Sequence, residues 1–88
     1  MLWYVYLVRC CDGSLYCGIS TDVGRRVDRH NACRGAKYTC SRRPVVLVWH
    51  KLIGTQRNAM FAERRIKKLS KESKERLVRG LATEEGVS

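Results

Sequence analysis

Hydrophobic residues open the chain in two short runs separated by a turn signal. Residues 2–10 are rich in aromatic and β-branched side chains, and residues 14–20 form a second run of the same kind. The dipeptide Asp12-Gly13 between them is typical of a tight turn that joins antiparallel strands. We therefore predict a β-hairpin at the amino-terminal end.

The pattern changes to a helical period after the hairpin. Thr21 or Asp22 can cap a helix that runs to about Ala32, and the following stretch, residues 31–43, is basic and reads as a loop. Pro44 then opens a third strand over residues 45–53. Its run of Val and Leu predicts burial on both faces.

Two further helices complete the pattern. Thr55 can cap a helix that runs to about Leu69, and Ser70 can cap another that runs through Val78, with Gly80 as its stop. The predicted order β-β-α-β-α-α implies an α+β fold with a three-stranded sheet, made of the hairpin and one further strand, flanked by about three helices.

The length allows one small domain. We assign residues 1–80 of the 88 to it, and we expect residues 81–88, which show no periodic pattern, to be a frayed tail.

The charge is strongly one-sided. Eighteen Lys and Arg residues against eight Asp and Glu residues give a formal net charge of +10, which predicts attraction to polyanions such as nucleic acid. A highly charged surface without that role, as in a ribosome-associated protein, is the alternative that charge alone leaves open.

No secretory leader or membrane span is expected. The opening apolar run is far shorter than the roughly 20 residues that a span needs. The five cysteines are an odd number without CxxC spacing, so we expect reduced thiols rather than a disulfide framework or a zinc site, in a cytoplasmic protein with no membrane partner.

Several polar residues face the predicted core. On the first helix Arg26 and His30 fall beside the apolar stripe marked by Val23 and Val27. A buried-side arginine needs an anionic partner. Glu63 lies at the edge of the apolar face of the next helix, and spacing alone allows it either to pair with Arg26 or to hold a metal.

These residues carry a resemblance to a known family. Tyr4-Val5-Tyr6, ten residues before Tyr16-Cys17-Gly18 counted from tyrosine to tyrosine, resembles the paired motif of the GIY-YIG nuclease superfamily. Arg26, His30 and Glu63 stand where that family has its arginine, its His or Tyr, and its metal-binding glutamate. The stretch of residues 35–44 is similar to the small stand-alone YhbQ-like bacterial members.

The resemblance implies a metal-dependent endonuclease that hydrolyses phosphodiester bonds in DNA. Tyr6, or else Tyr16, would be the general base, Arg26 would clamp the phosphate, and His30 would orient or deprotonate the tyrosine. Glu63 would hold one Mg²⁺ or Mn²⁺. The basic loop would contact the nucleic acid through Arg34, Lys37, Tyr38, Arg42 and Arg43. The alternatives are an inactive nucleic-acid-binding module of the same fold and an adaptor with a protein partner.

A site shared by the two tyrosines puts a condition on the hairpin. A plain two-residue loop at Asp12-Gly13 would place Tyr6 and Tyr16 on opposite faces of the sheet, because side chains alternate along a strand. A three-residue turn with Gly13 in the left-handed conformation brings them to one face. We predict this second form.

Overall fold

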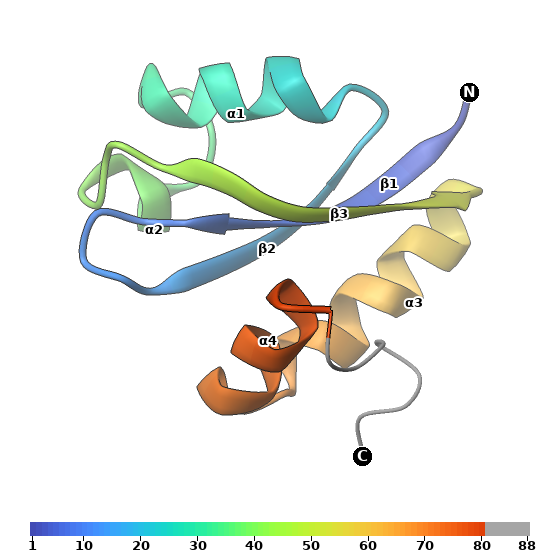
Figure 1. The fold of residues 1–88 in the computed structure, drawn as a ribbon. Coiled ribbons are helices and arrows are strands. Elements are labelled where there is room, and N and C mark those ends of the chain that lie inside the picture. Colours follow the sequence, from blue (N-terminus) through green and yellow to red (C-terminus); the bar gives the residue numbers. More distant parts are fainter. Residues whose placement is uncertain (81–88) are drawn as a thin grey trace.

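The computed structural model describes residues 1–80 and has an antiparallel sheet of three strands with four helices around it (Figure 1). The expected tail, residues 81–88, lies outside the described residues. The predicted α+β fold is confirmed, with the elements β1 (Trp3–Arg9), β2 (Leu15–Ser20), α1 (Val23–Asn31), α2 (Lys37–Cys40), β3 (Val46–Gly54), α3 (Gln56–Lys67) and α4 (Lys71–Val78).

Strand β1 is the centre of the molecule. It pairs with β2 on one side and β3 on the other, and the side chains from Val5 to Val8 are at most 1% exposed. Val5 and Leu7 face the core under α3 and α4, whereas Tyr6 and Val8 face the core under α1. The fold therefore has three layers, with α1 on one face of the sheet and the last two helices on the other (Figure 1).

The helices begin at local capping signals. The Asp22 carboxylate accepts a hydrogen bond from the backbone N–H of Arg25, so of the two predicted caps Asp22 is the one used. Thr55 and Ser70 cap α3 and α4 in the same way, as predicted. Within residues 1–80 no helix is long and apolar enough to cross a membrane.

The hairpin has the predicted odd loop. Tyr6 pairs with Gly18 and Val8 pairs with Tyr16, so both tyrosines lie on the face covered by α1. The turn closes with Cys10 N–H donating to Ser14 O at 2.8 Å, and Gly13 takes the left-handed conformation with φ of 85°. The condition for a shared site is met.

Two predictions were wrong, one for strand β3 and one for the basic stretch that precedes it. Strand β3 is not buried on both faces: Val46 is 60% and Leu52 49% exposed, because β3 is an edge strand and β1 takes the centre. The basic stretch is not all loop either, since it contains the short helix α2.

The prediction of five reduced thiols was also wrong. Cys33, just after α1, forms a disulfide with Cys40 at the end of α2. Their Cα atoms are 4.6 Å apart, within the range that a disulfide spans, because the chain turns back on itself between the two helices. Cys10, Cys11 and Cys17 are free thiols.

A paired arginine and glutamate tie α4 to the hairpin. The Arg9 guanidinium donates two hydrogen bonds to the Glu75 carboxylate, at 2.6 and 2.7 Å, and a third to Gly13 O at 3.3 Å. These contacts hold the pKa of Glu75 below its ordinary value, chiefly through the hydrogen bonds from Arg9.

We predict that Glu75→Gln lowers the free energy of unfolding by about 1 kcal/mol at pH 7, as expected for a bidentate, partly exposed pair. Because the pKa of Glu75 is lower in the folded state, this stabilisation is present above the unfolded value of about 4.3 and is lost as the pH falls through the folded value. Denaturant unfolding of both proteins between pH 7 and pH 3 measures it. A difference that stays constant down to pH 3 would contradict the assignment.

Candidate active site

A buried chain of hydrogen-bonding side chains crosses from the sheet to the α1 layer. Tyr6 Oη lies 2.8 Å from His30 Nε2, and His30 Nδ1 lies 2.8 Å from Thr39 Oγ1. The Thr39 hydroxyl in turn donates to Ala36 O at 2.9 Å. The three side chains are between 0 and 1% exposed, so the chain is sealed inside a domain that has little interior to spare for polar groups.

Two glycines make room for this chain. A Cβ on Gly18 would overlap the phenol of Tyr6, which lies directly across the hairpin, and a Cβ on Gly35 would overlap the imidazole of His30. Neither glycine has a positive φ, so it is the missing side chain that the site uses here. The glycine of the second motif is thereby explained by packing.

Burial sets the protonation states of the two rings. Burial raises the pKa of Tyr6, and the nearby positive charge of Arg26 offsets only part of that effect. Burial also lowers the pKa of His30, and Arg26 lowers it further by repelling the imidazolium form. At neutral pH Tyr6 is therefore protonated and His30 is uncharged.

Arg26 has a buried donor without a partner. Its Nε is inaccessible to solvent and makes no hydrogen bond within residues 1–80. The ion pair with Glu63 that the spacing allowed is not formed. Arg26 instead lines a pocket of about 320 Å³ between the end of β2 and the start of α1, together with Ser20, Thr21, Asp22, Arg25 and Arg29.

Tyr16 is the more accessible of the two motif tyrosines. It is half-buried, and its ring meets His30 edge-on with centroids 5.4 Å apart. Tyr38 stacks on its other side at 5.8 Å, and the Arg42 guanidinium lies 3.9 Å from the centre of the Tyr38 ring. In the described part of the chain the Tyr16 hydroxyl has no hydrogen-bond partner, so it is free to contact a bound molecule.

Glu63 approaches from the opposite face of the sheet. It lies on α3, and its charge, after burial, helps to raise the pKa of the Cys17 thiol on β2 to about 12. Lys67 connects it to the tyrosines: its Nζ lies 3.4 Å from the Glu63 carboxylate and 5.9 Å from the Tyr16 ring centroid. Glu63 and Tyr16 therefore approach the same edge of the sheet, along β2, with Lys67 between them.

The residues at this edge offer one carboxylate to a metal. No group of three or more His, Cys, Asp and Glu side chains gathers anywhere in residues 1–80. Mg²⁺ is commonly held by one or two carboxylates, with water and substrate phosphate oxygens completing its shell. The partly exposed Glu63 fits that kind of site and does not fit an all-protein cage.

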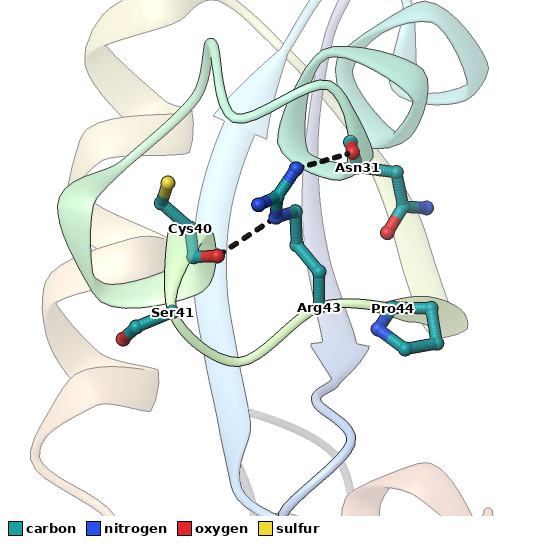
Figure 2. A pocket seen from close by; sticks show the side chains of 5 residues that line it. All are labelled: Asn31, Cys40, Ser41, Arg43 and Pro44. Carbon is teal, nitrogen blue, oxygen red and sulfur yellow. Dashed lines mark hydrogen bonds between the residues drawn. The ribbon is translucent and has the colours of Figure 1, made fainter.

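The predicted nucleic-acid-binding loop divides into two groups. Arg42 donates to Asp12 at 3.0 Å and to Tyr38 O at 2.9 Å, and Arg43 donates to Cys40 O at 2.8 Å and to Asn31 O at 3.3 Å. Figure 2 shows Arg43 holding the ends of α1 and α2 together beside a pocket of about 440 Å³. These arginines fix the loop.

The other predicted residues of the loop are open to solvent. Arg34 and Lys37 are exposed, and Tyr38 is 39% exposed above Tyr16. Of the ten predicted site residues, the structure gathers Tyr6, Tyr16, Arg26, His30, Tyr38 and Arg42 on the α1 face, brings Glu63 to the shared edge, and leaves the remaining three outside this cluster.

The sequence reasoning missed four contributors. Thr39 and Gly35 lie in the stretch interpreted as loop, and no periodic pattern there marks them as buried. Arg25 and Arg29 are exposed and point away from the apolar stripe of α1, so nothing in the sequence distinguishes them from other solvated charges, although both line the pocket beside Arg26.

Comparison with known proteins decides the family. Residues 2–76 match the model of the GIY-YIG catalytic domain. The chain belongs to the GIY-YIG family. The relationship that the paired motif indicated is confirmed.

Relatives in this family cover most of the chain. A UPF0213 protein of Vibrio cholerae is 49% identical over 91% of this chain and 80% of its own length. A UPF0213 protein of Staphylococcus haemolyticus is 47% identical over 85% of this chain and 92% of its own length. The UPF0213 proteins are the YhbQ-like members that the basic stretch resembled.

Two solved structures share the fold. The solution structure of the UPF0213 protein BH0048 from Bacillus halodurans is 44% identical, with a TM-score of 0.58 over 90% of this chain and 84% of that one. The protein EF2693 from E. faecalis is 38% identical, with a TM-score of 0.62 over 91% and 85%. The GIY-YIG arrangement of the sheet and helices is therefore common to this group.

We predict that Gly18→Ala displaces Tyr6 from His30 and destabilises the fold by about 1–3 kcal/mol, the usual cost of overpacking a core. Gly24→Ala on α1 is the matched control. A Cβ there meets only Asp22 at 3.9 Å, so the change should stabilise by about 0.5–1 kcal/mol. Denaturant unfolding of both variants tests this, and equal effects would show that Gly18 is not a packing requirement.

Proposed function

We propose that this protein is a divalent-metal-dependent endonuclease that hydrolyses phosphodiester bonds in DNA. The observation that carries the proposal is the buried, unpartnered Nε of Arg26, a residue that lines a pocket with two more arginines and lies near Tyr6 and the uncharged His30. A buried donor without a partner favours an anionic ligand. A guanidinium matches the geometry of a phosphate.

The charge of the surrounding surface supports a polyanionic substrate. The formal net charge is +10, and two basic residues near α2, Arg34 before it and Lys37 at its start, are exposed. Such contacts to the backbone give affinity that is independent of sequence and falls with salt. The arginines Arg25 and Arg29 extend this positive surface from the clamp at Arg26 along the helix.

The site residues divide the chemistry among them. Arg26 binds the scissile phosphate and stabilises the charge that develops on it. Tyr16, half-buried with a free hydroxyl, orients the attacking water. The pair of Tyr6 and His30 accepts the proton of that water, which requires the bound substrate to open the Arg26 side of the site, because Tyr6 is only 1% exposed in the free protein. A tyrosine with a raised pKa is a poor base alone, so the uncharged imidazole at 2.8 Å is the group that makes this acceptance feasible.

Glu63 would hold one Mg²⁺ or Mn²⁺ at the edge of β2. When bound, such an ion supplies a positive charge next to the leaving oxygen. Lys67, which contacts both the Glu63 carboxylate and the Tyr16 ring, keeps this carboxylate at the same edge as the tyrosine.

We predict that the protein cleaves labelled DNA in Mg²⁺ or Mn²⁺ and that Glu63→Gln lowers kcat by about 100-fold or more, the usual effect of removing one stabilising group from a reaction centre. Glu72→Gln, which removes the same charge from an exposed position in the first turn of α4, is the matched control and should leave kcat unchanged. A panel of duplex, flap, forked and single-stranded substrates identifies the preferred DNA.

The outcomes separate the candidate functions. Metal-dependent products lost in Glu63→Gln and kept in Glu72→Gln support the endonuclease. Salt-sensitive DNA binding without cleavage, equal in all three proteins, would replace it with a nucleic-acid-binding module of the same fold.

A further inference from the structure

The hydrogen bonds around His30 determine which ring nitrogen carries the proton. The Thr39 hydroxyl is placed to donate its single proton to Ala36 O at 2.9 Å, and with the proton there it acts toward His30 only as an acceptor. In this arrangement His30 Nδ1, 2.8 Å from that hydroxyl, is the protonated nitrogen. Nε2 of an uncharged ring is then an acceptor, and the Tyr6 hydroxyl donates to it across 2.8 Å.

We propose that Thr39 is a positioning residue that fixes this tautomer of His30 and so makes Tyr6 and His30 able to accept a proton. The inference deepens the proposed function and rests on it. In the other tautomer Nε2 would carry a hydrogen and donate to Tyr6, and the uncharged imidazole would then have no free nitrogen on the side of the tyrosine.

The proton step balances with the direction of the bonds that this tautomer implies. As the water attacks phosphorus, a new P–O bond forms, the P–O bond to the leaving oxygen breaks, and that oxygen departs as an alkoxide that takes a proton from bulk water. One O–H bond of the attacking water breaks, and a new O–H bond forms on Tyr6. The original Tyr6 O–H bond breaks in the same step, and an N–H bond forms on His30 Nε2. His30 becomes an imidazolium whose Nδ1–H still donates to Thr39. Tyr6 ends as it began and never needs to be a phenolate in the resting protein.

The segment between α1 and β3, which contains α2, is built around Thr39. Thr39 is the buried residue of the four-residue helix α2, and it is fully inaccessible. Ala36 O, which receives its proton, lies at the amino-terminal cap of α2, and a side chain on Gly35 would overlap the imidazole. The disulfide between Cys33 and Cys40 joins the two ends of this segment.

Other groups around His30 do not determine the tautomer. The titratable or charged side chains near the ring are Tyr6, Tyr16 and Arg26. Arg26 affects the charge state of the His30 ring, and the Tyr16 ring contacts the His30 ring edge-on. Thr39 alone, within residues 1–80, forms a hydrogen bond with Nδ1.

The test compares Thr39→Val, which keeps the shape and removes the hydroxyl, with Thr39→Ser, which keeps the hydroxyl. Long-range ¹H–¹⁵N spectra of histidine side chains read the tautomer directly, without substrate or metal. We expect the Nδ1–H form of His30 in the wild type and in Thr39→Ser, and a rise of the Nε2–H form in Thr39→Val. We also expect kcat to fall about 10- to 1,000-fold in Thr39→Val with little change in KM, and Thr39→Ser to retain most of it.

Several results would overturn the inference. A wild-type spectrum with His30 in the Nε2–H form excludes it whether or not the variants fold. An unchanged Nδ1–H form in a folded Thr39→Val also excludes it. A wild type with the Nδ1–H form that cuts no DNA would instead overturn the proposed function and keep the assignment of Thr39 as the residue that sets the tautomer.

Discussion

The hydrogen bond between Tyr6 and His30 is the contact on which the rest of the site depends. It joins the central strand β1 to the last turn of α1 at 2.8 Å, with both side chains excluded from solvent. Buried polar groups destabilise a small core unless they are satisfied. The missing side chains of Gly18 and Gly35, the hydroxyl of Thr39 and the short helix α2 are all arranged to satisfy this one pair.

Arg26 supplies the positive charge beside the buried pair of Tyr6 and His30. Burial chiefly keeps the imidazole uncharged, and the positive charge beside it adds to that effect while it partly offsets the effect of burial on the pKa of the Tyr6 phenol. The arginine itself has no anionic partner among the described residues and keeps a buried N–H unsatisfied. An imbalance of this kind is unfavourable in a merely structural core, and the anion that we propose to bind in the pocket between β2 and α1 would offset it.

The features of the fold that could be predicted from the sequence are those set by residues close together in the chain. Helix starts follow from the capping residues Asp22, Thr55 and Ser70, and the loop of the hairpin follows from requiring two tyrosines on one face. Strand order is not local: β1 and β3 are both runs of aromatic and β-branched residues, and only the packing of α1, α3 and α4 decides that β1 is central and β3 an edge. Thr39 was missed for the same reason, since its burial depends on α2 folding under α1.

The most direct measurement of the central claim follows the arginine Nε–H resonances by NMR while a short DNA strand is added without metal. Arg26 should respond first and at the lowest DNA concentration, because its Nε–H is buried and unpartnered, whereas Arg65, exposed on α3, should respond weakly and only at low salt. Arg26 remaining unchanged while exposed arginines such as Arg65 shift would contradict the account, because the pocket beside Tyr6 and His30 would then not bind phosphate.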